Sequence, residues 1–373
     1  MKKRIFLSSP TMNGHEKKYI DEAFASNWIA PLGKNVDEFE KEIANYVGIG
    51  YAAALTAGTA AIHLALKLCN VQRDDVVFCS DLTFSATVNP VSYENGKQVF
   101  IDSEYDTWNM DPKALEKAFE RYPNPKAVVV VNLYGTPGKL DEIAAICKKH
   151  NVPLIEDAAE SLGAKYKNIQ TGSLGNIGIF SFNGNKLITS SGGGMLVSNK
   201  EADVQKARFW ATQAREPARH YQHNEIGYNY RMSNIVAGIG RGQMHSIDEH
   251  IAKKQHIYET YKAAFADIKD ITMNPYMDCT EPNFWLSCLT LNKGCSVTPD
   301  NIMDALDGEN IESRPIWKPM HMQPIFENCD YIKIAENSVS EDIFHRGICL
   351  PSDIKNTESD MNLIIKIIKR LWQ

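Results

Sequence analysis

Two charged residues in the middle of the chain stand where a cofactor-dependent reaction would need them. Asp157 ends an apolar run that predicts a strand, and Lys186 follows the next apolar run. A lysine amine can form a Schiff base with the aldehyde of pyridoxal phosphate, while a carboxylate keeps the pyridine nitrogen protonated so that the ring accepts electrons. The pair therefore predicts pyridoxal phosphate chemistry, and amino-group transfer is the reaction that such an electron sink permits.

Each of these residues alone also allows a plainer interpretation. Asp157 could be the N-cap of a helix starting at Ala158, and Glu156 beside it leaves the choice between two carboxylates open. Lys186 could be one more surface lysine. Its neighbours are uncharged, however, and the glycine run at 192–194 indicates that the backbone closely approaches a ligand or another segment.

A phosphate site is predicted at the start of an apolar helix. Gly58 and Thr59 begin this stretch, and glycine there lets backbone N–H groups approach an anion at the helix N-terminus. Ser181 could donate a hydroxyl to the same phosphate, although taken alone a Gly-Thr helix start is more often just a cap. Phe84 follows a strand at the same predicted sheet edge, so it could stack on a planar ring or pack in the core.

The elements that must position these residues alternate along the chain. From about residue 50 to 200, short β-rich runs alternate with helical stretches, which predicts a mostly parallel sheet between helices. Ligands of such sheets collect at the carboxyl ends of the strands. We expect strands at 76–79, 98–101, 127–131, 152–155 and 177–182, and helices at 58–69, 112–122 and 138–150.

The length of 373 residues exceeds what one hydrophobic core usually supports, so two domains are expected. A charged amphipathic stretch at 246–268 predicts a long linking helix, and the run 284–291 after it predicts a strand. We expect a large cofactor-binding domain over residues 1–245 and a small α+β domain over residues 246–373. The candidate packing positions of the linking helix are Ile247, Ile251, Ile257, Tyr261 and Phe265.

Composition excludes several classes of function. A formal net charge of −6 argues against a general nucleic-acid role, since phosphate backbones demand clustered Lys and Arg. No apolar run is long enough to span a bilayer and no signal peptide is recognisable, so we expect a cytoplasmic protein without membrane partners. The eight cysteines lack zinc-site spacing, which predicts reduced thiols and no metal site.

Two further segments carry polar groups suited to binding. The polar-aromatic stretch 227–233 contains Asn229 and Arg231, and a structural turn would explain it equally well. In 314–321, two prolines fix the backbone while Arg314, Lys318 and His321 project from it, which suits an anionic substrate. An exposed proline-rich connection is the competing interpretation.

Taken together, these motifs resemble the DegT/StrS family of nucleotide-sugar aminotransferases, which are fold-type I pyridoxal phosphate enzymes. The resemblance runs over nearly the whole chain and implies a mostly parallel seven-stranded sheet between helices, followed by a smaller α+β C-terminal domain. The matching segments are 27–30, 39–40, 58–63, 156–160, 181–186 and 311–315.

The resemblance also implies a role for each candidate residue. Lys186 would be the catalytic Schiff-base lysine and Asp157 the partner of the pyridine nitrogen. Glu160 would lie beside the phenolic oxygen, where many members have Gln. The other cofactor contacts would come from Gly58, Thr59 and Ser181 at the phosphate, Phe84 on the ring, and Asn229 of the neighbouring subunit in a homodimer with shared active sites. The residues expected to contact the nucleotide sugar are Trp28, Arg231, Lys318 and His321.

The implied reaction moves an amino group from L-glutamate to a sugar ketone. The segments 181–186 and 317–324 look most like enzymes that aminate C4 of a UDP-2-acetamido-4-keto-2,6-dideoxyhexose, for amino-sugar and surface-glycan synthesis. The close competitor is GDP-perosamine synthase, with a GDP-linked 4-keto-6-deoxymannose as acceptor. A sugar 3-dehydratase would lack the Schiff-base lysine, whereas Lys186 is present.

Two hypotheses of other classes can be weighed against this one. A non-catalytic pyridoxal phosphate-binding regulator would be expected to carry an added DNA-binding module, and neither length nor charge provides one. A nicotinamide-dependent oxidoreductase would need Gly-x-Gly-x-x-Gly between a first strand and helix, and that context is missing from the sequence.

Overall fold

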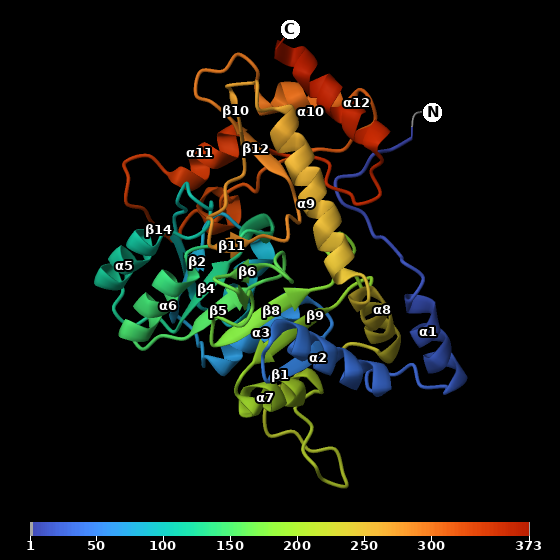
Figure 1. Ribbon diagram of the computed structural model, residues 1–373. Coiled ribbons are helices and arrows are strands. Elements are labelled where there is room, and N and C mark those ends of the chain that lie inside the picture. The colour runs from blue at the N-terminus through green and yellow to red at the C-terminus, as the bar shows by residue number, and fades with distance from the viewer. Residues whose placement is uncertain (1–2, 373) are drawn as a thin grey trace.

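The centre of the molecule is an eight-stranded sheet, seen in a computed structural model that describes residues 3–372 (Figure 1). The strand order is β1-β9-β8-β5-β4-β2-β3-β14. β9 runs antiparallel to β1 and β8, and all other neighbours in this sheet are parallel. The strands are β1 (Tyr51–Leu55), β2 (Val76–Ser80), β3 (Lys97–Ile101), β4 (Ala127–Val131), β5 (Leu154–Asp157), β8 (Ile177–Ser181), β9 (Gly194–Ser198) and β14 (Asp330–Ile332).

Helices cover both faces of this sheet, as the alternating sequence pattern predicts. All five residues of β4 are buried, because its side chains alternate between two covered faces. Val128 and Val130 pack with α5 (Pro112–Arg121) and α6 (Leu140–Lys149), while Val129 packs with α3 (Gly58–Leu68) and α7 (Glu201–Ala211). The α/β fold class is therefore confirmed.

The central sheet has eight strands, one more than the seven that were expected. The eighth strand, β14, comes from the C-terminal third of the chain and pairs in parallel with β3, with Tyr331 opposite Phe100. Three residues with an aspartate and a tyrosine give no extended apolar run, so the sequence pattern did not indicate a strand there.

The N-terminal helices pack at the β1 end of the sheet. The buried face of α2 (Lys34–Val47) consists mainly of Val36, Phe39 and Ile43. These side chains belong to the same hydrophobic cluster as Phe180 of β8 and Met195 of β9. Helix α8 (Asn234–Met244) packs against both α2 and α1 (Glu16–Ala25), whereas α4 (Asn89–Tyr93) packs against α3 and β3.

The long helix predicted at 246–268 is α9 (Ile247–Ala264), and Figure 1 shows it rising from α8 to the C-terminal elements. Four of its five candidate packing residues are buried, and Ile251 is half-buried. The C-terminal sheet has the order β10-β12-β15-β13. Its elements are β10 (Ile271–Met273), β12 (Cys288–Leu291), β13 (Arg314–Pro315), β15 (Gly347–Cys349), α10 (Pro299–Asp307), α11 (Val339–Arg346) and α12 (Glu358–Lys369).

One expected strand is shorter than its apolar pattern indicates. The run 284–291 forms a strand only over β12, because Phe284 has a φ of 52° and turns the chain. A small three-stranded sheet joins β11 (Thr280–Glu281) to β6 (Lys165–Tyr166) and β7 (Ile169–Gln170). The division into domains at residue 245 stays a prediction.

None of the helices within residues 3–372 is both long enough and apolar enough to cross a membrane. The same residues contain no group of three His, Cys, Asp or Glu side chains arranged to hold a metal ion.

Candidate active site

A cavity of about 360 Å³ lies at the carboxyl ends of β5 and β8, beside the first turn of α3. Seven of the eight predicted cofactor residues line it, although they are spread over more than a hundred residues of sequence. They are Gly58, Thr59, Phe84, Asp157, Glu160, Ser181 and Lys186.

Lys186 reaches this cavity from the loop after β8. Its side chain is only 13% exposed, and Nζ lies 3.8 Å from Oε1 of Glu160 and 4.1 Å from the centroid of the Trp285 ring. Within the described part of the chain, the amine has no hydrogen-bond acceptor. Burial lowers the pKa of Lys186, against the opposing charges of Glu160 and Asp157. A lysine with a lowered pKa and a free amine is suited to attack a carbonyl carbon.

Asp157 is the last residue of β5, and its carboxylate is buried at the cavity wall. Oδ2 accepts a hydrogen bond of 2.7 Å from the Thr87 hydroxyl, and Oδ1 accepts one of 3.1 Å from the Ala159 N–H. Burial raises the pKa of Asp157, while Thr87, Ala159 and the charge of Lys186 lower it. No helix follows at residue 158, so the N-cap interpretation is wrong and the Ala159 bond closes a turn.

The ambiguity between Asp157 and Glu156 is resolved by what Glu156 contacts. Its Oε1 accepts a hydrogen bond from the Asn132 amide, and its Oε2 accepts from the N–H groups of Leu174 and Gly175. Neighbouring residues of a strand point to opposite faces of the sheet. Only Asp157 of the two lines the cavity.

Glu160 lies opposite Lys186 in the same cavity and is 4% exposed. Its Oε2 accepts a hydrogen bond of 2.7 Å from the backbone N–H of Tyr134. Burial raises the pKa of Glu160, although the charge of Lys186 acts in the opposite direction. The carboxyl can therefore hold a proton near the lysine amine.

The predicted phosphate site is built from close backbone packing at the start of α3. A Cβ on Gly194 would lie 2.3 Å from the carbonyl carbon of Ala57 and 2.4 Å from the nitrogen of Gly58. A Cβ on Gly58 would lie 3.2 Å from Cβ of Ser181. The first N–H groups of a helix have no partner within it, and the helix dipole adds positive potential there. The glycine run therefore brings β9 against the helix start and leaves the first N–H groups of α3 beside Ser181.

Phe84 is 49% exposed, so the core-packing interpretation is wrong. Its ring lies 5.2 Å from that of Trp317, and both rings line the cavity. An exposed aromatic face at the mouth of a cavity is available to stack on a planar ligand.

A second cavity of about 810 Å³ adjoins the first and shares Phe84, Asn185, Trp285 and Trp317 with it. Lys318 lines this second cavity together with Arg314. The two cavities lie side by side, with the Lys186 amine in the smaller one and Lys318 and the ion pair of Arg314 with Glu312 in the larger one. This arrangement suits a ligand that carries both a reacting group and a phosphate.

The other three predicted substrate residues line neither of these cavities within the described chain. Trp28 is 47% exposed, and its indole N–H donates to the Leu32 carbonyl. Arg231 is half-buried, and its charge partly opposes the rise in the pKa of Glu40 that burial causes.

His321 is instead held between two carboxylates. Nδ1 lies 2.7 Å from Oδ2 of Asp81, Nε2 lies 2.9 Å from Oε1 of Glu341, and the ring stacks on Tyr331. Burial alone would lower the pKa of His321, but the bonds to both carboxylates raise it above its usual value. Both ring nitrogens are therefore occupied within the chain, and a direct contact with the substrate stays a prediction.

Asn229, the eighth predicted cofactor residue, is exposed and pairs with Thr212 outside the cavity. Its predicted contact with a neighbouring subunit stays a prediction.

Sequence reasoning missed three residues that shape the site. Trp285 and Trp317 form walls of both cavities, and Thr87 donates to Asp157. Trp285 follows a turn far along the chain, and no motif marked it. Thr87 could have been found, because it follows Phe84 by less than one helical turn.

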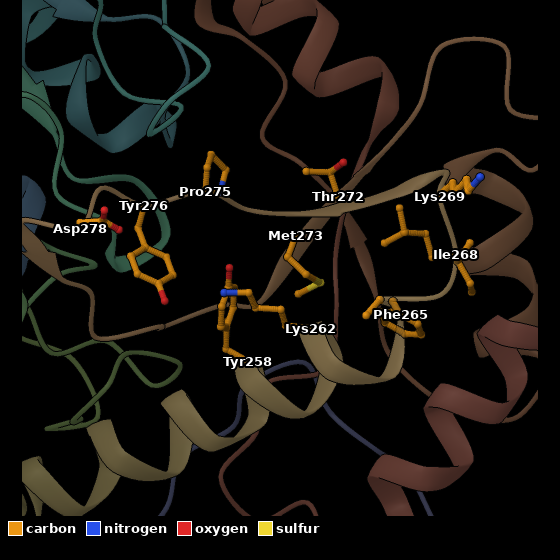
Figure 2. A pocket seen from close by; sticks show the side chains of 12 residues that line it. Tyr258, Lys262, Phe265, Ile268, Lys269, Thr272, Met273, Pro275, Tyr276 and Asp278 are labelled. Carbon is orange, nitrogen blue, oxygen red and sulfur yellow. The ribbon is translucent and has the colours of Figure 1, made fainter.

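A third cavity of about 510 Å³ lies between α9 and β10, away from these residues (Figure 2). Figure 2 shows Tyr258 and Lys262 of α9 facing Met273 and Tyr276 across it. It shares no lining residue with the other two cavities among the described residues, so it contributes nothing to the candidate active site.

The chain matches a known protein family and is similar to several known proteins. The model of the DegT/DnrJ/EryC1/StrS aminotransferase family matches residues 10–369. A Bacillus subtilis protein named "Putative pyridoxal phosphate-dependent aminotransferase EpsN" is 53% identical over 100% of this chain and 97% of its own length.

Two relatives with named sugar products are less similar. A GDP-perosamine synthase of Caulobacter vibrioides is 36% identical over 99% of this chain and 98% of its own. A UDP-4-amino-4,6-dideoxy-N-acetyl-beta-L-altrosamine transaminase of Campylobacter jejuni is 35% identical, over 62% of each chain. Among solved structures, Helicobacter pylori PseC, an aminotransferase involved in pseudoaminic acid biosynthesis, superposes with a TM-score of 0.89 at 22% identity over 99% of both chains.

Proposed function

Because the chain belongs to the DegT/DnrJ/EryC1/StrS aminotransferase family, whose members depend on pyridoxal phosphate, we propose that it moves an amino group from L-glutamate to C4 of a nucleotide-linked 4-keto-6-deoxy sugar. The observation that carries this proposal is the convergence of Lys186, Asp157 and Glu160 on one cavity. Bound there, pyridoxal phosphate supplies a protonated ring that accepts electrons from a carbon losing its proton.

The residues of the cavity fit this cofactor. An amine without a hydrogen-bond acceptor among residues 3–372, a buried carboxylate, an exposed aromatic face and a helix N-terminus are the groups that its aldehyde, ring nitrogen, ring face and phosphate require. We assign these contacts to Lys186, Asp157, Phe84 and the pair Gly58 and Thr59. Ser181 adds a hydroxyl at the phosphate.

Proton transfer is the task of Lys186 once its amine is released. Burial lowers the pKa of Lys186, which favours the neutral amine that can take a proton from one carbon and return it to another. The Glu160 carboxyl lies 3.8 Å from this amine, and burial raises its pKa, so the two groups can exchange a proton. Asp157, with two hydrogen bonds to its carboxylate, holds the proton on the ring nitrogen.

For the acceptor, we propose UDP-2-acetamido-4-keto-2,6-dideoxyhexose. The likeness of segments 181–186 and 317–324 supports it, as does the similarity to the Campylobacter jejuni transaminase. The second candidate is GDP-4-keto-6-deoxymannose, favoured by the similarity to a GDP-perosamine synthase over almost the full chain. The larger cavity is lined by Lys318 and by Arg314, which is paired with Glu312, and these two cations suit the diphosphate of either compound.

We further propose that the protein works as a cytoplasmic homodimer. The cavity of a single chain lacks Asn229, and a second copy would bring this residue to the phosphate. The exposed Trp28 and Ile29 form part of an apolar surface that a partner could cover. Sedimentation of the loaded protein as a monomer of 41.9 kDa would contradict this part of the proposal.

The central test is covalent. The loaded protein should show a visible absorbance band that L-glutamate bleaches, and borohydride reduction followed by peptide mapping should place the cofactor on Lys186. Lys186→Ala should lose the band and slow turnover by roughly 10³-fold or more, whereas Lys165→Ala, on the surface strand β6, should behave as wild type. A label on any other lysine contradicts the assignment.

Acceptor identity is tested separately, by comparing turnover of the two nucleotide sugars at equal concentration. We expect a higher kcat/KM for the UDP sugar. Turnover of the GDP sugar alone would make the second candidate correct and would leave the assignment of Lys186 untouched.

A further inference from the structure

The backbone on the C-terminal side of Lys186 is held by a buried histidine of α9. His250 is 3% exposed, and its Nδ1 lies 3.0 Å from the carbonyl oxygen of Leu187. Burial lowers the pKa of His250, so its ring is neutral near pH 7. Because a carbonyl can only accept, the single ring proton must sit on Nδ1 and be donated to Leu187.

One turn later on the same helix, Lys254 points into the same region and is also 3% exposed. Its ammonium donates to the carbonyls of Ser352 at 2.6 Å and Trp285 at 3.0 Å, and to the hydroxyl of Ser8 at 3.2 Å. Three acceptors match the three protons that Lys254 carries when it is charged, and burial lowers its pKa to about 7, so above neutrality the amine keeps two of these donors. Lys254 therefore joins α9, the N-terminal segment and two C-terminal loops at one point.

Two of these partners, Trp285 and Ser8, also donate hydrogen bonds to Asn185, the residue that precedes Lys186. The carbonyl of Asn185 accepts a hydrogen bond of 2.7 Å from the Trp285 indole and one of 3.0 Å from the Ser8 hydroxyl. The Trp285 ring also lies 4.1 Å from Nζ of Lys186. Lys254 thus fixes both donors that hold Asn185, while His250 fixes Leu187.

We propose that His250 and Lys254 are positioning residues that hold the backbone on both sides of Lys186 and so aim its amine into the cavity. This inference rests on the proposed function, since it gives Lys186 the covalent role. Burying an ammonium costs free energy that an apolar side chain of the same volume would avoid, so filling space does not explain Lys254. Small displacements of a reacting group slow catalysis strongly, which gives the arrangement its value.

The test compares four single variants with wild type. His250→Ala removes the donor to Leu187, and His250→Asn restores an N–H near the position of Nδ1. Lys254→Met keeps the length of the side chain without the amine. The matched control is Lys253→Met, because Lys253 is the exposed neighbour on α9 and pairs only with Glu249 among the described residues.

We expect His250→Ala and Lys254→Met to slow the single-turnover reaction with L-glutamate by about 10- to 100-fold, with the KM for glutamate within about twofold. The pH midpoint of the visible band should shift by about half a unit or more in both, because that band reports the environment of the lysine nitrogen. His250→Asn should recover most of the rate, and Lys253→Met should match wild type in both measurements.

A role in stability alone would lower the melting temperature and leave the rate and the midpoint unchanged in the folded, loaded variants. That result overturns the inference, and so does an equal rate in His250→Asn and His250→Ala. If Lys254→Met does not fold, Ser8→Ala replaces it, since it removes the same link to Asn185. Borohydride labelling distinguishes failure of the proposed function from failure of the positioning role. A label on a residue other than Lys186 in wild type refutes the proposed function. Variants that are labelled at Lys186 and keep the wild-type rate and pH midpoint refute only the positioning role.

Discussion

Glu160 and Lys186 face each other with 3.8 Å between Oε1 and Nζ. Burial shifts the pKa of each group in the direction that favours its neutral form. The pKa of the carboxyl rises and the pKa of the amine falls, despite their mutual attraction. Burial therefore favours a pair that shares a proton more evenly than a surface ion pair does. Two predictions concern the carboxylates of this site.

Glu160→Gln should change how the stability of the cofactor-free protein depends on pH. Because the folded pKa of Glu160 lies above the ordinary 4.5, its contribution to stability is complete below pH 4.5 and is lost as pH rises through the folded pKa. The unfolding free energy of wild type minus that of Glu160→Gln should therefore fall with pH, by up to about 1.4 kcal/mol per unit. Urea unfolding at several pH values measures this difference, and a flat difference would refute the buried-carboxyl argument.

Asp157→Asn should retain the fold and lose activity, because a neutral amide cannot hold the proton on the ring nitrogen. We expect kcat/KM to fall by roughly 10²-fold or more. Thr87→Val removes one of the two hydrogen bonds to this carboxylate and should cost about tenfold. These kcat/KM values are measured in steady state with a nucleotide sugar acceptor. A kcat/KM of Asp157→Asn within twofold of wild type would exclude the assigned role.

Gly194→Ala should destabilise the chain and loosen the phosphate site. Its Cβ would lie 2.3 Å from a backbone atom of Ala57, so β9 and the start of α3 must move apart, at a cost of about 1–3 kcal/mol. A Cβ on Gly192 meets nothing within 4 Å, so Gly192→Ala should change the unfolding free energy by less than about 0.5 kcal/mol. Equal stability of the two variants in urea would show that the close approach is not needed.

Lys254 should make the folded protein more stable as pH rises above neutrality. Burial lowers its pKa from 10.5 to about 7, so between these values the unfolded chain binds a proton that the folded protein does not. The stability of wild type relative to Lys254→Met should rise by up to about 1.4 kcal/mol per pH unit in this window. Lys253→Met, at an exposed site, should show no such slope relative to wild type when unfolding is followed by circular dichroism.

The sequence predicted those parts of the structure that depend on local patterns. Uniformly apolar runs such as 127–131 identified the buried parallel strands, and their carboxyl ends located Asp157 and Lys186. Trp285 and Lys254 reach the site only through tertiary packing, so no spacing in the sequence marks them. The positive φ of Phe284, which shortens the expected strand, likewise has no signature in the apolar pattern.

The orientation of the His321 side chain could not be predicted from the sequence. Its motif predicted a binding segment, and one residue of that segment, Lys318, lines the larger cavity. Which side chains of that segment turn toward the cavity depends on Asp81 and Glu341, whose hydrogen bonds hold the ring of His321. Residue type and proline spacing carry no information about those distant partners.

Strand β14 makes the two ends of the chain depend on each other during folding. Its parallel pairing leaves β3 without an open side, and a fragment ending near residue 245 would present the backbone of 97–101 to solvent. Such a fragment should self-associate even if its cofactor residues are all present. A nascent chain on the ribosome would meet the same hazard until residue 332 has emerged, so completion of the central sheet must wait for nearly the entire polypeptide.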